Sequence, residues 1–353
     1  MKLLPFFFAL AWLRQSCSAQ ANEPIHRFVQ VNGIKMHIAE QGRGPLVVLM
    51  HGFPELGYNW RHLMPILAAA GYHAVAPDMR GYGQTDAPPN IADYSQLQAV
   101  GDIVGLVRAL GYESAVAVGH DTGATTAANC AILRPDIFRA VVQLSVPYSA
   151  RAEGALEPSE ANRRRVPQGR QFYVTYYQVA GVAEKLMEAD PKRTLRMWLY
   201  SSSGGVPQAH KARYTFDLNE TALDGRTEPE RLPAWLKPED LDYFAQEFSR
   251  TGFRGALNWY RAQDIFWEAT PFLVGRQILQ PTLFIGGADD PWIAQVGQEA
   301  IDNLDKSVPN LWKKVLLPGI GHSVEQEAPN EVSQLLIEFL RFVDSQPSAP
   351  KKN

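Results

Sequence analysis

Short apolar runs recur along the chain and are separated by stretches of helical character. The runs PLVVLM, HAVAPD, SAVAVG and AVVQLSV begin at residues 45, 73, 114 and 140, and PTLFIG and KKVLL begin at 281 and 313. Near-continuous apolar strands that alternate with helices are typical of a parallel sheet covered on both faces. Residues 28–40 alternate around Asn32-Gly33, which predicts a hairpin ahead of these strands. The pattern predicts an α/β fold with a mostly parallel eight-stranded sheet and helices on both faces.

Residues 148–271 interrupt this strand rhythm. The segment is rich in charged and aromatic residues and is predicted to be helical. We therefore predict a helical cap over residues 148–271, inserted into a core formed by residues 22–147 and 272–353. Apolar positions between Val332 and Val343 keep helical spacing and predict a closing C-terminal helix.

The composition is that of an ordinary globular protein. The 353 residues include 34 basic and 37 acidic side chains, so no electrostatic reason exists to expect nucleic acid as a partner. Cys17 and Cys130 are the two cysteines, which excludes a disulfide framework and a cysteine-based metal site. The histidines show no convincing metal spacing. We expect no metal, no organic cofactor, and a monomer or homodimer.

The N-terminus has the organisation of a secretory signal. Lys2 precedes an apolar run over residues 3–13, and residues 19–21 read Ala-Gln-Ala, so residues 1–21 are predicted to be a signal peptide. A helix packed on the body is the alternative. The run is shorter than the roughly 20 residues that span a bilayer, so we expect no stable membrane insertion. In a eukaryotic secretory route, Asn219 would be a glycosylation site of this secreted protein.

A strand-to-helix turn carries the main chemical signal. The sequence Gly119-His120-Asp121-Thr122-Gly123 follows an apolar run and precedes a stretch rich in small residues. Small residues on both sides suit a sharp turn whose central residue has strained dihedral angles. The central Asp121 would be a nucleophile that attacks a saturated carbon and leaves an alkyl ester on the enzyme. An ordinary turn without catalytic function is the alternative.

Two further residues lie where a nucleophile would need them. His322 follows the last predicted strand, and Asp290 follows the strand before it. The carboxyl ends of parallel strands are where open α/β sheets place their sites. Asp289 is the competing choice for the acid, and Asp290 is preferred because it comes immediately before Pro291.

The segment His51-Gly52-Phe53-Pro54 follows the first parallel strand. Its position suits one half of an oxyanion hole, in which the backbone amides of Phe53 and Thr122 would hold a developing negative oxygen. A tight structural turn, with Pro54 in the cis form, is the alternative, and both interpretations can hold together.

With these motifs, residues 28–343 resemble the soluble epoxide hydrolases of the α/β-hydrolase family. The resemblance rests on HGFPE at residues 51–55, DMRGYGQTDAP at 78–88 and GHDTGA at 119–124, and on the chain order of nucleophile, acid and histidine. In the cap, Tyr173 opens YVTYYQVAGVAE and Tyr260 lies in GFRGALNWYR, similar to the stretches that carry the family's two catalytic tyrosines. Tyr176 would replace Tyr173 if the register slips by one turn.

The resemblance implies a two-step reaction that gives a vicinal diol. Asp121 would attack an epoxide whose oxygen is held by Tyr173 and Tyr260. His322, oriented by Asp290, would then activate a water that cleaves the ester. The pocket is expected to include the four residues His51, Pro54, Trp259 and Trp292. Many family members carry tryptophan where this chain has Thr122, and the phosphatase domain of mammalian relatives has no counterpart in this sequence.

Two other functions remain open at this stage. A haloalkane or haloacid dehalogenase shares the elbow aspartate and the histidine, but it needs donors for a departing halide. Thr122 offers neither a ring N–H nor a guanidinium, and paired cap tyrosines suit an epoxide better. A catalytically dead hydrolase that serves as a binding protein is the third possibility, although none of the five expected catalytic residues is missing.

Overall fold

An eight-stranded sheet forms the centre of the computed structural model, which describes residues 23–346. In spatial order the sheet is β1-β2-β4-β3-β5-β6-β9-β10. The strands are β1 (Ile25–Val31), β2 (Ile34–Gln41), β3 (Leu46–Met50), β4 (His73–Pro77), β5 (Ala115–His120), β6 (Phe138–Leu144), β9 (Thr282–Gly287) and β10 (Leu311–Leu317). β1 and β2 form the predicted hairpin, β2 is antiparallel to β4, and the other neighbours are parallel. The predicted α/β fold is confirmed.

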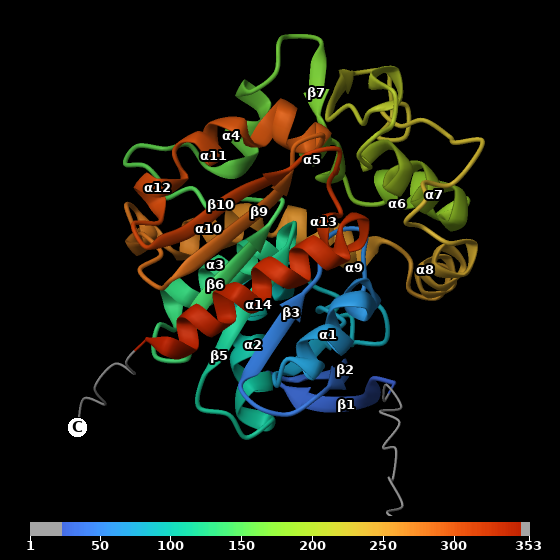
Figure 1. Ribbon diagram of the computed structural model, residues 1–353. Helices are drawn as coiled ribbons and strands as arrows, with labels where there is room; N and C mark the ends of the chain where they lie inside the picture. The colour runs from blue at the N-terminus through green and yellow to red at the C-terminus, as the bar shows by residue number, and fades with distance from the viewer. Residues whose placement is uncertain (1–22, 347–353) are drawn as a thin grey trace, which may run out of the picture.

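Helices cover both faces of the sheet because each central strand is apolar on both sides. Successive strand residues point to opposite faces. Val47 and Leu49 of β3 therefore pack with one pair of helices, and Leu46 and Val48 pack with the other pair. The first pair is α1 (Leu63–Ala69) and α14 (Pro329–Ser345), and the second is α2 (Gln96–Ala109) and α3 (Thr122–Leu133). The predicted C-terminal helix is α14, which crosses the front of the sheet in Figure 1.

Between β6 and β9 the chain leaves the sheet and forms a separate helical layer, seen at the top and right of Figure 1. Its elements are α4 (Pro158–Arg164), β7 (Arg170–Phe172), α5 (Tyr173–Tyr177), α6 (Val182–Glu188), α7 (Pro191–Ser202), β8 (Thr215–Asp217), α8 (Pro238–Thr251), α9 (Arg254–Arg261) and α10 (Gln263–Ala269). β7 and β8 pair as an antiparallel ribbon. The sequence pattern does not indicate this ribbon because each strand has only 3 residues. We call residues 148–271 the cap.

Three further short α-helices lie around the last two strands. They are α11 (Gln298–Asp302), α12 (Leu304–Ser307) and α13 (Val324–Glu327). The signal peptide predicted for residues 1–21 lies outside the described residues. Within residues 23–346, no helix is both long enough and apolar enough to cross a bilayer. Asn219 of the sequon is exposed in the cap.

Candidate active site

The strand-to-helix turn places Asp121 between β5 and α3 in a strained conformation. Its φ and ψ are 52° and −119°, outside the regions that most residues adopt. A Cβ on Gly119 would lie 2.0 Å from the Gly123 carbonyl oxygen, and a Cβ on Gly123 would lie 2.2 Å from that of Met50. Only glycine fits at either position, so the glycines allow the turn to project Asp121 above the end of the sheet.

The structure brings Asp121, His322 and Asp290 together from three segments of the chain. His322 Nε2 lies 3.5 Å from Asp121 Oδ2, and His322 Nδ1 lies 2.7 Å from Asp290 Oδ2. A carboxylate can only accept, so Nδ1 carries the proton and Nε2 faces the nucleophile. All three side chains are buried. Asp289, by contrast, is exposed, so the aspartate that contacts the histidine is Asp290.

The charges at this site stabilise one another. Burial opposes ionisation of Asp121, but His322, His120 and the Phe53 amide outweigh it and lower the pKa of the carboxyl group. Burial also disfavours a charge on His322, but Asp290 and Asp121 outweigh it and raise the pKa of the imidazole well above its ordinary value. The two carboxylates therefore favour the imidazolium form of His322 in the resting site.

The backbone after β3 contributes a donor to the nucleophile. The Phe53 amide donates to Asp121 Oδ1 at 3.0 Å, which leaves Oδ2 as the oxygen that faces His322. The Phe53–Pro54 peptide bond is cis, and both residues are buried. Thr122 is the first residue of α3, where helical amides have no partner within the helix. Among the bonds formed by residues 23–346, none joins the Thr122 amide to the carboxylate.

Two tyrosines of the cap lie close to the nucleophile. Tyr173 begins α5 and Tyr260 lies in α9, and their buried rings are 5.9 Å apart between centroids. Burial and the charge of Asp121 raise the pKa of both phenols, so both stay protonated and can donate. Tyr176, the alternative left open by the sequence, is only partly buried and its ring packs on Phe216.

The structure gives the four expected pocket residues different surroundings. Trp259 lines a cavity of about 160 Å³ together with Thr122. The Trp292 amide donates to Asp290 Oδ1 at 2.7 Å, and its side chain partly offsets the rise in the pKa of the Tyr173 hydroxyl.

The side chain of His51, by contrast, is held by main-chain groups. Its Nδ1 donates to the Gly52 carbonyl oxygen at 2.9 Å, and its Nε2 accepts from the Met79 amide at 2.9 Å. Both ring nitrogens are thus engaged by the main chain, and burial lowers the pKa of the ring. The imidazole joins two loops beneath the site and has no free nitrogen for a substrate. Pro54 is buried in the same loop.

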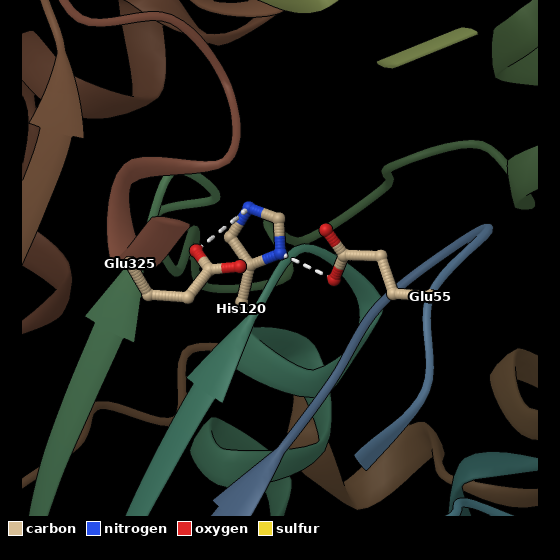
Figure 2. A group of neighbouring side chains, drawn as sticks. All are labelled: Glu55, His120 and Glu325. Atoms are coloured by element: carbon tan, nitrogen blue, oxygen red, sulfur yellow. Dashed lines mark hydrogen bonds and ion pairs between the residues drawn. The ribbon is translucent and has the colours of Figure 1, made fainter. Parts of the chain in front are cut away.

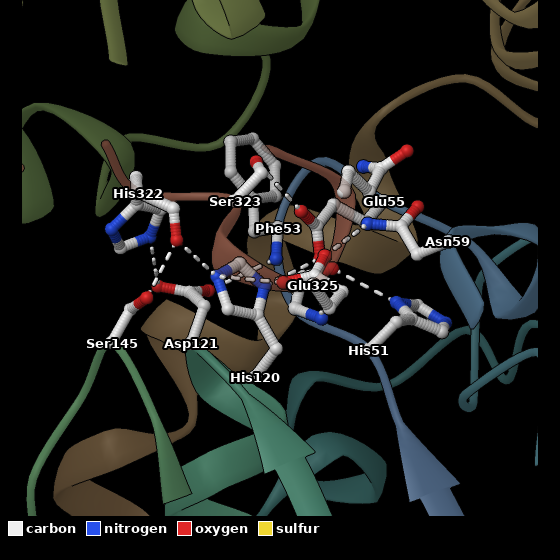
Figure 3. A network of polar contacts seen from close by, with 12 residues as sticks. His51, Phe53, Glu55, Asn59, His120, Asp121, Ser145, His322, Ser323 and Glu325 are labelled. Atoms are coloured by element: carbon white, nitrogen blue, oxygen red, sulfur yellow. Dashed lines mark hydrogen bonds and ion pairs between the residues drawn. The ribbon is translucent and has the colours of Figure 1, made fainter. Parts of the chain in front are cut away.

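A buried polar cluster behind the nucleophile was not anticipated from the sequence. His120 lies between Glu55 and Glu325, as Figure 2 shows. Its Nδ1 is 2.8 Å from Glu55 Oε2, and its Nε2 is 2.8 Å from the main-chain oxygen of His322. Figure 3 shows how these contacts connect the nucleophile's strand with the loop of His322. Glu55 lies in the segment HGFPE and Glu325 lies in the segment HSVEQE. Nothing in the sequence indicates that these two glutamates come close together in the fold.

The contacts of this cluster determine its protonation. Both ring nitrogens of His120 face oxygen acceptors, so both carry protons if Glu55 is ionised. Burial disfavours this charge, but Glu325 and Glu55 outweigh it and raise the pKa of His120 to about 9. Glu325, buried with its Oε2 3.8 Å from His120, has its pKa raised by burial to about 7.

The same three side chains could in principle hold a metal ion, because their ligand atoms lie within 4.8 Å of one another. A metal needs a bare ring nitrogen on His120, however, and both nitrogens point at hydrogen-bond acceptors at 2.8 Å. A protonated imidazole satisfies these contacts without an ion. We therefore interpret the cluster as a buried ion pair with a nearby second carboxyl group.

Comparisons with known proteins agree with this geometry. A family model described as the alpha/beta hydrolase fold matches residues 45–325. Epoxide hydrolase A of Mycobacterium tuberculosis is 41% identical over 90% of this chain and 97% of its own length. An epoxide hydrolase of Caballeronia sordidicola is 40% identical over 90% of this chain and 94% of its own.

Solved structures give the same result. An epoxide hydrolase from an endophytic Streptomyces is similar with a TM-score of 0.88 and 41% identity, covering 92% of this chain and 97% of the other. Epoxide hydrolase A from Mycobacterium thermoresistibile is similar with a TM-score of 0.84 and 42% identity, covering 90% and 98%. The similarity extends over the core and the cap alike.

Proposed function

The chain belongs to the epoxide hydrolases of the α/β-hydrolase fold, and we propose that Asp121 forms a covalent ester with the epoxide, which His322 then hydrolyses. The product is a vicinal diol. The observation that carries this assignment is the position of Asp121, which has the His322–Asp290 pair on one side and two protonated cap phenols close by. The similar proteins described above are epoxide hydrolases, so they do not favour the alternative of a haloalkane or haloacid dehalogenase.

In the first step Asp121 opens the ring. Phe53 holds Oδ1, so Oδ2 attacks an epoxide carbon and the carbon–oxygen bond of the ring breaks. The departing alkoxide takes a proton from Tyr173 or Tyr260, which are the donors that an epoxide oxygen needs. The product of this step is a hydroxyalkyl ester on Asp121, with Oδ1 as its carbonyl oxygen.

Ester formation prepares His322 for the second step. The ionised Asp121 raises the pKa of His322, and an ester carries no such charge. Once the ester has formed, the imidazolium can therefore release its proton, which replaces the proton that Tyr173 or Tyr260 gave to the alkoxide. Neutral His322 then takes a proton from a water molecule, and this water attacks the carbonyl carbon of the ester, which is Cγ of Asp121. The amides of Phe53 and Thr122 stabilise the negative Oδ1 of the tetrahedral intermediate. When the intermediate collapses, the bond between Cγ of Asp121 and Oδ2 breaks, and the departing alkoxide takes the proton back from His322 to give the diol. The carboxylic acid left on Asp121 then gives its proton to His322, which restores the resting site.

The test uses His322→Gln, which should block the second step and spare the first. The variant is incubated with a panel of epoxides and haloalkanes, and its intact mass is recorded. A gain equal to one whole epoxide supports the proposal, and Asp121→Asn should abolish that gain. A gain from a haloalkane that is short of one hydrogen halide would identify a dehalogenase. No adduct, together with no diol from the wild type on a wider set of epoxides, would refute the mechanism.

We further propose that residues 1–21 are removed during secretion. The support is the charged, apolar and small-residue order of this segment. N-terminal sequencing of the protein recovered from its natural source tests the idea. A mature chain that begins near residue 22 supports it, and an intact Met1 contradicts it.

A further inference from the structure

The cap and the loop of the catalytic histidine are in direct backbone contact. The cap helix α7 ends at Ser202, and the Ser202 carbonyl oxygen accepts from the His322 amide at 2.9 Å. A Cβ on Gly204 would lie 2.1 Å from the Gly319 carbonyl oxygen, and a Cβ on Gly321 would lie 2.2 Å from the Gly204 nitrogen. The two backbones touch without intervening side chains. The position of His322 therefore depends on where the end of α7 lies.

One carboxylate joins these two segments. Glu327 ends α13, close to where the core meets the cap in Figure 1. Its Oε2 accepts from the Gly204 amide of the cap at 2.7 Å and from the Gly321 amide of the core at 2.9 Å. A single oxygen thus holds both the end of the cap helix and the residue before His322. Its Oε1 is buried and has no hydrogen-bond partner within residues 23–346.

The main chain of His322 is held from two sides. Its amide is bonded to the cap through Ser202, and its carbonyl oxygen accepts from Ser145 Oγ at 2.6 Å and His120 Nε2 at 2.8 Å. The core contacts appear in Figure 3. Because the core side is fixed by β5 and β6, movement at the cap side would tilt the imidazole relative to Asp121. A misplacement of about 1 Å in a catalytic group can cost on the order of 100-fold in rate.

We propose that Glu327 is a positioning residue that couples the cap to the catalytic loop and so keeps His322 aligned for ester hydrolysis. The inference rests on the proposed role of His322. Glu327 acts through the Gly204 and Gly321 amides and does not contact the reacting atoms. Ionised carboxylates make shorter and stronger hydrogen bonds to amides than neutral acceptors do. The coupling is therefore strongest when Glu327 is ionised.

The charged groups around Glu327 come from both layers. Burial is the largest cause that raises the pKa of Glu327 to about 7. The Gly321 and Gly204 amides oppose this rise, and the charges of Asp290 and Glu325 of the core add to it. Lys211 of the cap is the nearby cation, and its Nζ donates to the Ser203 and Asp289 carbonyl oxygens at 2.8 and 2.7 Å. The coupling should accordingly strengthen as the pH rises through neutrality.

The experiment separates the two half-reactions in full-length Glu327→Gln and Glu327→Ala. Glutamine has the same shape and keeps an oxygen for both amides but has no charge, whereas alanine removes the acceptor. Glu331→Gln, an exposed glutamate at the start of α14, is the matched control. Alkylation is followed in single turnover, and the steady-state fraction of ester-bound protein is measured by intact mass at pH values from 6 to 8.

We expect Glu327→Ala to slow ester hydrolysis about tenfold or more and to change alkylation by less than about twofold. Ester-bound protein should therefore accumulate. In Glu327→Gln the hydrolysis rate should rise less steeply between pH 6 and 8 than in the wild type, which a purely structural role would not cause. Equal losses in both half-reactions, or no change in either variant, would overturn the proposal.

If Glu327→Ala does not fold, the proposal is tested by Glu327→Gln alone, through the dependence of its ester-hydrolysis rate on pH. His322→Gln serves as the reference for the underlying mechanism. An ester trapped in His322→Gln, with unchanged kinetics in both Glu327 variants, would refute only the coupling. Failure of His322→Gln to form any ester, with no diol from the wild type, would instead refute the proposed function.

Discussion

The His120 imidazole donates from Nε2 to the main-chain oxygen of His322 at 2.8 Å, so the residue before the nucleophile holds the backbone of the catalytic histidine. The other ring nitrogen contacts Glu55 at 2.8 Å. Two acceptors around one ring favour the imidazolium form. This cation also lowers the pKa of Asp121. The cluster behind the elbow is therefore part of the electrostatics of the nucleophile.

Glu325→Gln should lower the pKa of His120. The carboxylate of Glu325 is one of two groups that raise this pKa to about 9 in spite of burial. Removing its charge leaves Glu55 as the remaining anionic neighbour within the cluster. NMR titration of the His120 ring protons measures the change, with Glu331→Gln as the control. An unchanged His120 titration would show that Glu325 is uncharged over that pH range.

The same substitution should alter how stability depends on pH. Burial raises the pKa of Glu325 to about 7 in the folded protein, above its ordinary value of 4.5. The folded state therefore binds more protons than the unfolded state between these values, and the free energy of unfolding falls as the pH rises through this window. We expect Glu325→Gln to lose less stability than the wild type between pH 5 and 8. Urea unfolding at several pH values tests this, and parallel curves would contradict it.

Asp121→Asn should lower the pKa of His322. The neutral amide reproduces the loss of charge that ester formation causes, and the charge of Asp121 helps to raise the histidine pKa. NMR titration of the His322 ring in the two proteins makes the comparison. A histidine that titrates identically in both would mean that ester formation does not release its proton.

Asp290→Asn should slow ester hydrolysis by about 100-fold or more, because His322 loses the acceptor that fixes its tautomer. The Oδ2 of Asp290 lies 2.7 Å from His322 Nδ1. Asp289→Asn is the matched control, since its side chain is exposed. Stopped-flow kinetics of the two half-reactions should show an unchanged alkylation rate in both variants. A larger effect from Asp289→Asn would reverse the assignment.

Replacing both Tyr173 and Tyr260 with phenylalanine should reduce alkylation by about 100-fold or more, which is the range for loss of a positioned acid. Each single variant should lose less, because the other phenol still donates to the epoxide oxygen. Tyr176→Phe provides the control, since the ring of this residue is only partly buried and packs on Phe216. Single-turnover measurements with one epoxide are sufficient. Wild-type alkylation in the double variant would exclude both tyrosines as donors.

The sequence by itself determined the architecture of the sheet. The apolar runs and the Asn32-Gly33 hairpin predict the strands because side-chain period and turn chemistry are local properties. The elbow could also be predicted, because a sharp strand-to-helix turn needs small residues on both sides of its centre. The structure adds the reason, since a Cβ at Gly119 or Gly123 would collide with main-chain oxygens. Strand ends gave the positions of Asp290 and His322, because parallel strands deliver their following loops to one edge of the sheet.

Only the tertiary structure decided which neighbouring side chain meets which partner. Asp289 and Asp290 are adjacent in sequence, and the turn after β9 buries one and exposes the other. Glu55 and Glu325 lie far apart along the chain and meet at His120 because the loop after β3 and helix α13 converge behind the elbow. Glu327 likewise joins amides from the cap and the core. Such contacts depend on how loops and layers pack, and no local pattern of residues encodes that packing.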